Sequence, residues 1–483
     1  DRWRRSVARI MAVVVTACFG TTAFGQTTWF VSNDPAENPD FAHPRDALAS
    51  PMVVDGDTIE VSEGIAPYSV GPDDRFDFLG KAVTMRAEGG ERPVLTSISS
   101  PLNPTSMVRF TSGEGPDSVL EGFVLRPNAY AYAGVYIEGS SPTIRRCEFS
   151  GLTTAAGPLV FVYSGSATVE QCEFRGNNPY EWELIDARTL VKLQDCVFVD
   201  NSGIRGLLRA GSVYLLDCRV ENNRCPEVGS FISGMWLTVE RCTFEGNSAF
   251  NQSAAEFLDV GAMFQLGNTV LARNGFRTFI RLQPWAIVFV RNTTMVQNGG
   301  EWLHESPVGA TTLQNCIIWN NGPQPGFGAG TLVGYSNVQG GWPGVGNIDR
   351  DPMFADAQFR LGAGSPCIDA GDNTAVPTGV TKDLFRSPRF RDDPATPDTG
   401  NGTAPIVDMG AAEFFVCRAD ILPDGIVNNE DFFYFLTLFC AAHPGTDFTT
   451  FAVPGTQGYG VPNGAVTNDD FFFYLTIFVA GCD

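Results

Sequence analysis

Apolar and polar positions recur with a short period through the middle of the chain. We number each copy of the repeat from a reference position, position zero, which is cysteine in six of nine copies. The side chains two residues after and three residues before position zero are apolar in every copy. The reference positions are Gly122, Cys147, Cys172, Cys196, Cys218, Cys242, Thr269, Thr293 and Cys316. A repeat of 22–27 residues that is rich in strand formers predicts a stacked solenoid.

The alternation within one copy predicts short strands and the bends between them. Positions minus five, minus three, zero and plus two face inward, because alternate residues of a strand share a side. The phase slips between minus three and zero, so the chain must bend at minus two or minus one. Asn or Asp occupies minus one in five copies and tolerates the left-handed conformation of a tight bend. With a third strand before the next copy, the pattern predicts an all-β parallel β-helix with three strands per coil.

The repeat resembles the right-handed parallel β-helix of the pectin-lyase-like superfamily over about residues 28–345. The segment 43–48 resembles the capping helix of that family, and the segment 56–61 with Gly64 resembles its first strand. The resemblance implies the fold. It does not specify an activity, because this fold carries lyases, hydrolases and non-enzymatic adhesins.

The third strand has an aliphatic centre that we expect to face inward, with its two neighbours on the outside of the rod. The first outer ladder is apolar or aromatic: Tyr136, Phe161, Leu184, Leu207, Phe231, Phe257, Phe279 and Trp302. An exposed apolar stripe needs a ligand, or a cover such as a loop or the C-terminal segment. Aromatic rings offer an apolar face to sugars. The candidate ligand-binding residues are therefore Tyr136, Phe161, Phe231, Phe257, Phe279 and Trp302.

The second outer ladder is mostly polar: Glu138, Tyr163, Asp186, Arg209, Ser233, Asp259, Arg281 and His304. In the polysaccharide lyases that the repeat resembles, the equivalent sheet carries calcium-binding carboxylates and an arginine base. Asp186 with Arg209, and Asp259 with Arg281, have these residue types and are the candidate catalytic residues. The competing interpretation, which we favour, is an ionic ladder in which opposite charges on adjacent rungs offset one another.

Cysteine and asparagine form two further columns in the predicted rod. Five cysteines, from Cys147 to Cys242, occupy position zero on consecutive rungs, where rung spacing holds their Cβ atoms slightly beyond disulfide distance. We expect buried free thiols, with one oxidised pair as the alternative. The asparagines at plus five are expected to stack and hydrogen-bond along the rod. They are Asn177, Asn201, Asn223, Asn247, Asn274, Asn298 and Asn321.

The composition argues against several functions. A net charge of -22 disfavours nucleic-acid binding, which needs a basic surface. The three histidines (His43, His304 and His443) are scattered, which disfavours a Ser-His-Asp triad or a histidine-based zinc site.

The first 25 residues read as a secretory signal peptide. Four arginines precede an apolar run over 10–19, and Ala23-Phe24-Gly25 follows as a small-residue cleavage site. Met11 is an alternative start, and Cys18 lies in an imperfect lipoprotein box. We expect a secreted or cell-surface protein.

After the last repeat, the segment 346–416 is rich in Pro, Gly and Asp. Its stretches 364–372 and 405–414 resemble the end of secreted bacterial proteins called choice-of-anchor Q. The resemblance implies a module that closes a β-helix, and we expect it to cover the open core of the last coil.

The final segment, 417–483, contains a duplication and resembles type I dockerin repeats of the variant that ends in Gly-Cys. The stretch 424–433 returns as 463–472, and each copy runs into an aromatic helix-like stretch. Dockerin loops hold Ca²⁺ with oxygens spaced as in an EF-hand. The first loop supplies Asp420, Asp424, the Ile426 carbonyl, Asn428 and Asp431. Leu422 replaces one ligand of the first loop, and the second loop lacks more of its ligands. If either loop binds calcium, we expect it to be the first.

Three functions remain open from the sequence. The first, which we favour, is a monomeric β-helix on the 26–345 segment that binds polysaccharide or another surface component, with the C-terminal module attaching it to a cell-surface or cohesin-like partner. The second is a polysaccharide lyase or glycoside hydrolase. The third is a structural adhesin.

Overall fold

The computed structural model describes residues 26–480, apart from 72, 91, 99–104, 128–129, 152–156, 180–181, 226–228, 250–254, 284, 305–309, 323–326, 328–329, 416–417, 423–426, 455 and 457–458. The side chains at 229, 255, 279 and 301–304 are also outside this description. The expected signal peptide, residues 1–25, lies outside the described residues. Of the helices in the described part, none is both long enough and apolar enough to cross a membrane.

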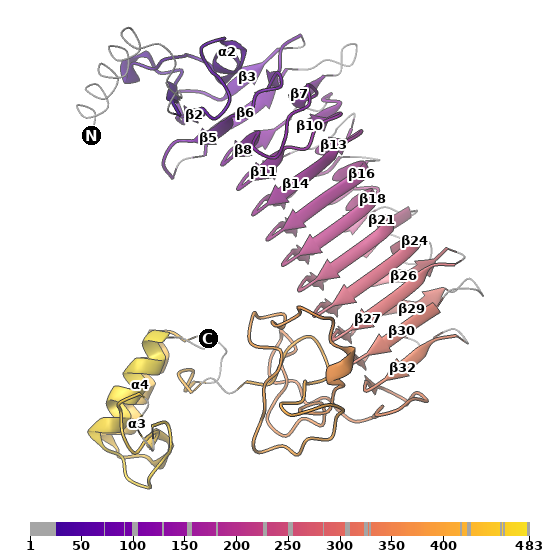
Figure 1. Cartoon of the computed structure of the whole chain (residues 1–483), viewed down its shortest axis with the longest axis vertical. Coiled ribbons are helices and arrows are strands. Elements are labelled where there is room, and N and C mark those ends of the chain that lie inside the picture. The colour runs from indigo at the N-terminus through magenta and orange to yellow at the C-terminus, as the bar shows by residue number, and fades with distance from the viewer. Residues whose placement is uncertain are drawn as a thin grey trace.

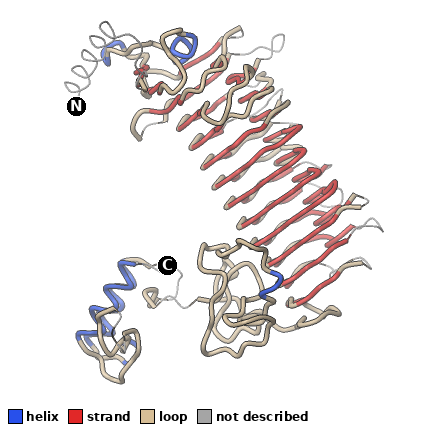
Figure 2. Tube along the Cα trace, viewed as in Figure 1, coloured by secondary structure: helices blue, strands red, loops and turns tan. Residues whose placement is uncertain are grey.

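The middle of the chain winds into a parallel β-helix, seen in Figures 1 and 2 as a rod of stacked strands. Each coil contributes to three faces. Four long strands turn the corner between face one and face two without a break: β16 (Ile185–Gln194), β18 (Leu208–Leu216), β21 (Gly229–Glu240) and β24 (Ala255–Gly267).

The remaining strands belong to one face each. Face one also has β4 (Phe76–Asp77), β7 (Ser106–Phe110), β10 (Ala133–Ile137), β13 (Val160–Val162), β26 (Gly275–Leu282) and β29 (Gly299–His304). Face two also has β1 (Thr28–Val31), β2 (Thr58–Val61), β5 (Thr84–Ala87), β8 (Val119–Glu121), β11 (Thr143–Arg145), β14 (Ser166–Glu170), β27 (Ile287–Arg291), β30 (Ala310–Gln314) and β32 (Leu332–Gly334). The two-residue strands β20 (Arg224–Cys225) and β23 (Ser248–Ala249) precede β21 and β24.

Face three is a separate sheet of twelve strands. They are β3 (Tyr68–Val70), β6 (Val94–Ser97), β9 (Val124–Arg126), β12 (Glu148–Ser150), β15 (Glu173–Arg175), β17 (Val197–Val199), β19 (Arg219–Glu221), β22 (Thr243–Glu245), β25 (Val270–Ala272), β28 (Thr294–Val296), β31 (Ile317–Trp319) and β33 (Asn337–Val338). All three faces enclose one continuous apolar core that runs from Val31 to Val338.

The start of the rod differs in one respect from the expectation. The capping helix is present as α2 (Pro44–Ala49), and its Ala47 and Leu48 are buried in the core. However, Thr58–Val61 forms the second strand of face two, because β1 precedes it and pairs with it in parallel. The short helix η1 (Pro35–Glu37) lies between β1 and α2.

The predicted bend lies at position minus one. Eight consecutive copies have a left-handed residue there, with φ between 46° and 55°: Arg146, Gln171, Asp195, Asp217, Arg241, Asn268, Asn292 and Asn315. A second left-handed position, plus four, follows the eight face-three strands from β12 to β31 and was not predicted. It is occupied by Gly151, Gly176, Asp200, Asn222, Gly246, Arg273, Gln297 and Asn320.

The expected register of the first copy is wrong by one residue. Val124 pairs with Glu148, and Leu125 with Phe149, so position zero of this copy is Phe123. Gly122 is instead the bend residue, with φ of 86°. Glycine reaches this conformation freely, which explains its presence one residue before the core position.

The asparagine column forms a continuous hydrogen-bonded ladder, as predicted. Each Nδ2 donates to the Oδ1 of the asparagine on the next rung, over 2.7–3.0 Å from Asn177 to Asn321. The same Oδ1 accepts the backbone N–H of the preceding asparagine. Each Nδ2 also donates to a face-three carbonyl on the preceding rung, such as that of Phe198 for Asn223. The ladder thus satisfies backbone groups that are buried at this corner.

The cysteine column is a stack of buried free thiols, which confirms the favoured interpretation. The backbone N–H of Cys147 lies 3.4 Å from the Sγ of Cys172, and that of Cys218 lies 3.3 Å from the Sγ of Cys242. Burial raises the pKa of the Cys172 and Cys242 thiols well above the ordinary value, so both stay protonated.

The segment 346–416 docks on the side of the rod, beside its last coils (orange in Figure 1; mostly loop in Figure 2). Cys367, Ile368 and Met409 pack on Ile317, and Phe359 and Ala411 pack on Val270 and Val296. These rod residues lie on face three, so the expectation of a cover over the open core is wrong for this segment. The end of the core instead contacts Phe327 and Trp342.

Hydrogen bonds at Asn315 fix this docking. The Asn315 side chain donates to the carbonyl of Asp372 (3.0 Å) and accepts the N–H of Asp372 (2.7 Å). The N–H of Gly410 donates to the Asn315 carbonyl (2.8 Å). The helix η2 (Asn373–Ala375) follows directly.

A buried ion pair organises the same segment. The Nε of Arg389 lies 3.0 Å from Oε1 of Glu413, and neither side chain is exposed. Arg389 also donates to the carbonyls of Asp408 and Gly410. Glu413 in turn accepts the N–H of Asp408. Asp408, Gly410 and Glu413, which all lie in the stretch 405–414, therefore belong to one buried network with Arg389.

Two helices pair in the C-terminal segment: α3 (Asn429–Cys440) and α4 (Asn468–Ala480), with η3 (Pro444–Thr446) between them. Phe435 and Tyr474 stack at 3.8 Å between ring centroids, and both are fully buried. The Tyr474 hydroxyl donates to the carbonyl of Ala419. The two helices expected from the duplication are present, while the likeness to dockerin stays a prediction.

Replacing one ladder residue, Asn223→Ala, should lower the free energy of unfolding by about 3 kcal/mol, because the Asn201 donors and the Phe198 carbonyl lose their buried partner. Chemical denaturation measures the change. The exposed Lys192→Ala on a neighbouring rung is the control, with an expected change below about 0.5 kcal/mol. Equal stability of the two variants would contradict the role of the ladder.

Alkylation should distinguish free buried thiols from a disulfide. Of the nine cysteines in the described residues, eight are buried and Cys440 is exposed. In the native protein Cys440 should be labelled by iodoacetamide, and the eight others at least about 100-fold more slowly until denaturant is added. Peptide mass spectrometry without reductant detects both the alkylated cysteines and any disulfide-linked peptides. A linked pair of column peptides would show that the minority interpretation is correct.

Candidate functional site

The predicted aromatic stripe on face one lies mostly inside the rod. Leu184, Leu207, Phe231 and Phe257 are fully buried and belong to the core, so the expectation that they face outward is wrong. They lie at the corner after the asparagine ladder, where the chain turns and two consecutive residues point inward. Phe231 and Phe257 stack there at 5.5 Å. Buried rings of this kind cannot contact a ligand.

Tyr136 and Phe161 do lie in an outer column, but a different one from that expected. Tyr136 pairs with Phe161, which pairs with Asp186, so these rings continue into the polar ladder. Although it points outward, Phe161 is only 5% exposed, because neighbouring rings and the Arg188 guanidinium cover it. Phe279 and Trp302 belong to β26 and β29, and their side chains lie outside the described residues.

Tyr136 and Phe161 belong to a cluster of rings and guanidinium groups, which we call the aromatic–arginine cluster. It consists of Arg109, Tyr132, Tyr136, Phe161, Tyr163 and Arg188. The Arg188 guanidinium lies 4.4 Å from the Tyr163 ring, and the Tyr136 hydroxyl donates to Glu138. Burial and this hydrogen bond raise the pKa of Tyr136 to about 12. The cluster satisfies its own aromatic faces through cation–π contacts.

The candidate catalytic residues form charge pairs. Arg209 donates through Nη2 to Oδ2 of Asp186 (2.5 Å), and its Nε lies 3.9 Å from Glu183. The hydrogen bond from Asp186 raises the pKa of Arg209, which keeps the guanidinium protonated and unsuited to act as a base.

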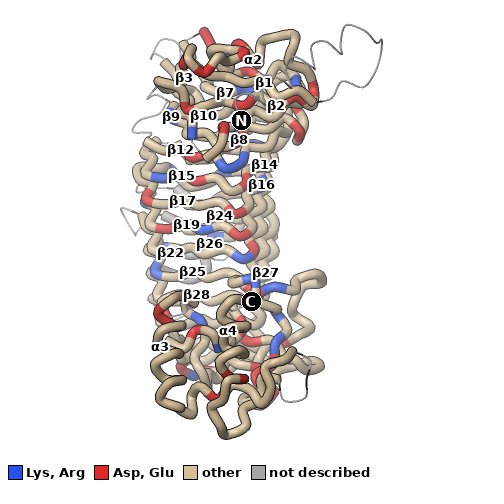
Figure 3. The backbone as a smooth tube through the Cα atoms, turned by 90° about the vertical axis from the view of Figure 1, so that its left-hand side faces the viewer, with Lys and Arg blue, Asp and Glu red and all other residues tan. Residues whose placement is uncertain are grey.

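The second candidate pair, unlike the first, forms bonds to other residues. Asp259 and Arg281 are neighbours in register, but Arg281 pairs with Glu256 (3.0 Å) and Asp259 accepts a hydrogen bond from Gln283 (3.1 Å). Figure 3 shows acidic and basic residues interspersed along the rungs of the rod. The favoured interpretation, offsetting charges on this face, is the one that these contacts support.

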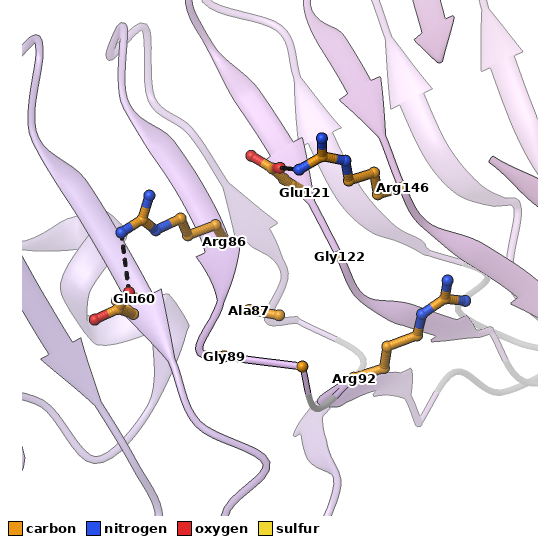
Figure 4. A pocket seen from close by; sticks show the side chains of 9 residues that line it. Glu60, Arg86, Ala87, Gly89, Arg92, Glu121, Gly122 and Arg146 are labelled. Atoms are coloured by element: carbon orange, nitrogen blue, oxygen red, sulfur yellow. Dashed lines mark hydrogen bonds and ion pairs between the residues drawn. The ribbon is translucent and has the colours of Figure 1, made fainter. Parts of the chain in front are cut away.

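A hollow of about 360 Å³ lies near the start of the rod, between β2, β5, β8 and the bend before β12 (Figure 4). Its charged lining residues are Glu60, Arg86, Arg92, Glu121 and Arg146. They pair with one another or with a neighbour: Arg86 with Glu60 (3.0 Å), Arg146 with Glu121 (2.9 Å) and Arg92 with Glu148 (3.3 Å). These pairings leave little net charge to attract an ionic ligand.

Face two also carries an exposed aromatic surface, which the sequence did not predict. One outer column runs Ser212, Trp236, Met263, Ile287 and Ala310 on consecutive rungs. The adjacent column, two residues further along each strand, runs Lys192, Tyr214, Thr238, Gln265, Phe289 and Thr312. We call these two columns the face-two surface. Trp236 is 53% exposed and Tyr214 is 48% exposed.

The geometry of this surface follows from the sheet. Consecutive rungs lie about 4.8 Å apart, and alternate residues of one strand lie about 6.7 Å apart. Tyr214 and Trp236 therefore occupy diagonal positions on adjacent rungs. Thr238, Gln265 and Thr312 place neutral hydrogen-bonding groups among the large apolar side chains. Such a surface presents rings and hydrogen-bonding groups together, on a rigid scaffold.

A signal for this surface was present in the sequence. Positions minus five and minus three were expected to face inward, so minus six and minus four must face outward. Large apolar side chains at Tyr214 and Trp236, and again at Met263, Ile287 and Phe289, are uncommon at outward positions.

The comparison with protein families agrees with the fold. The family described as right handed beta helix region matches residues 128–274. Among solved structures, pectate lyase Pel9A is 14% identical, with a TM-score of 0.40, over 83% of this chain and 98% of that chain. No curated protein matches the chain. The family match and the strand register together show a right-handed parallel β-helix, and they leave the activity open.

If the Asp186–Arg209 pair is structural, Asp186→Asn should lower the free energy of unfolding by about 1–3 kcal/mol, since it leaves Arg209 without its buried partner. The matched variant Arg281→Gln removes an ion pair that is exposed and should cost less than about 1 kcal/mol. Thermal and chemical unfolding of both variants measure the difference. An Asp186→Asn variant as stable as wild type would contradict the structural role of the Asp186–Arg209 pair.

Proposed function

We propose that this protein is a secreted or cell-surface β-helix that binds a neutral polysaccharide on the face-two surface. The observation that carries the proposal is the exposure of Trp236 and Tyr214 among neutral polar side chains in two straight columns. A pyranose ring has apolar C–H faces and equatorial hydroxyl groups. It can stack on an indole or phenol ring while its hydroxyls bond to Thr or Gln side chains.

Charge favours a neutral glycan over an acidic one. The chain has a net charge of -22, which repels polyanions at long range. In the two columns, Lys192 is the single ionisable side chain apart from the phenol of Tyr214. The face-two surface therefore has little to offer a carboxylated or sulfated chain and much to offer a neutral one.

The termini support the localisation that we propose. The arginine-rich and apolar start has the pattern of a signal peptide, and the C-terminal segment 417–483 would attach the rod to a cell-surface or cohesin-like partner. Calcium in the first loop of that segment stays part of the proposal. Of its five candidate ligands, Asp420, Asn428 and Asp431 are described, while Asp424 and Ile426 lie outside the described residues.

Asp431 already has other partners in this loop. Its Oδ1 accepts the N–H of Leu422 (2.9 Å), and its Oδ2 accepts the N–H of Asn428 (2.9 Å). Asn428 accepts the N–H of Glu430 and caps α3. Both side chains therefore stabilise the start of the helix, as in a capping box.

Removing one ring at a time tests the proposal. Trp236→Ala and Tyr214→Ala should each weaken binding to a neutral polysaccharide about tenfold, which corresponds to roughly 1.4 kcal/mol per ring. Affinity electrophoresis in gels that contain xylan, mannan, β-glucan or pectin compares the variants. The control is Tyr163→Ala, which removes a ring that is 41% exposed from the aromatic–arginine cluster on face one.

Two results would contradict the proposal. One is binding that depends on Tyr163 and not on Trp236 or Tyr214. The other is a preference for pectin over every neutral glycan. Reading new unsaturated or reducing ends in the same incubations detects a lyase or hydrolase activity directly.

A further inference from the structure

Three carboxylates from two stretches of the docked segment converge. Asp369 follows the stretch that packs on Ile317, while Asp392 and Asp398 come from the loop 389–400. One carboxylate oxygen from each of the three lies within 4.8 Å of the others. Asp392 and Asp398 are exposed, so the cluster is open to solvent on one side.

Asp369 supplies a second, separate observation. Its side chain is fully buried, and its Oδ1 has no hydrogen-bond partner among the described residues. Its Oδ2 accepts one long bond, of 3.3 Å, from the N–H of Asp393. A buried carboxylate oxygen without a donor is costly, and a bound cation would compensate for it.

The backbone around Asp369 holds the carboxylate in place. Its N–H donates to Oδ1 of Asp408 (2.7 Å), and its carbonyl accepts the N–H groups of Thr399 and Gly400 (2.9 and 3.0 Å). The last two bonds bring the loop that carries Asp398 against Asp369. The neighbouring Asp393 has a different role, since its oxygens accept hydrogen bonds from Ala395 and Thr396 in its own turn.

We propose that Asp369, Asp392 and Asp398 form a calcium site that ties the loop 389–400 to the docked segment. Three carboxylates in an open loop suit Ca²⁺, which takes six to eight oxygen ligands in flexible geometry and completes its shell with water. Mg²⁺ demands tighter octahedral geometry and retains its water more strongly. The site is distinct from the loop of the C-terminal module and does not depend on glycan binding.

Calcium here would strengthen the attachment of the segment to the rod. Asp369 lies three residues before Asp372, which hydrogen-bonds to Asn315 on the rod. Ca²⁺ would bind only when the loop 389–400 lies against Asp369. It would therefore stabilise the docked conformation.

Titration calorimetry of the full chain, stripped with chelator and titrated with CaCl₂, tests the site. Wild type should bind Ca²⁺, and Asp398→Asn should weaken one binding event at least about tenfold, since it removes one of three anionic ligands. The charge-matched control is Asp351→Asn, which removes an exposed carboxylate of the same segment and should leave binding unchanged. Hydrogen exchange should show slower exchange in peptides that span 389–401 when Ca²⁺ is added.

A separate variant distinguishes the two calcium hypotheses. Asp420→Asn changes the C-terminal loop. It should not change the affinity of the binding event that Asp398→Asn weakens. The proposal is overturned if wild type binds no Ca²⁺, if it binds Mg²⁺ in preference, or if Asp420→Asn abolishes all Ca²⁺ binding while Asp398→Asn has no effect.

Discussion

The fold depends on the requirement that buried polar groups on each rung find partners on the next. At the asparagine corner, backbone N–H and C=O groups are buried beside the core and out of reach of water. The next rung has an asparagine at the same position, so each side-chain amide hydrogen-bonds to the next from Asn177 to Asn321. A slip of register would break every bond of the ladder at once. From Asn177 to Asn321 the ladder therefore fixes which residues share a column at this corner.

Sequence reasoning succeeded where residues could be counted from a fixed point. Between minus one and plus five, every rung has the same length, bounded by two left-handed residues, so the columns of Cys172, Phe174 and Asn177 were predictable. The first copy failed because Gly122 takes the conformation of the bend while standing where a core residue was expected. A backbone preference of this kind cannot be read from the hydrophobic pattern alone.

Face one could not be counted in this way. The distance from position zero to face one varies along the rod, since the register-matched Leu208, Ile232 and Leu258 lie twelve, fourteen and sixteen residues after Cys196, Cys218 and Cys242. Tyr136 therefore looked equivalent to Leu184, whereas the structure pairs it through Phe161 with Asp186. The buried pair of Arg389 and Glu413 was also beyond prediction, because its partners are brought together by a docked segment without regular strands. Long-range contacts of irregular segments have no period to detect.

Besides the aromatic–arginine cluster of face one, outward apolar residues occur on faces two and three, with different outcomes. On face three, Val270, Val296 and Ile317 point away from the core and are buried under the segment 346–416. On face two, Trp236, Tyr214 and Ile287 point away from the core and remain exposed. The chain thus covers one apolar outer surface with its own residues and leaves the other open. Since an apolar surface in water is unfavourable unless something binds it, the uncovered columns are the natural place for a ligand.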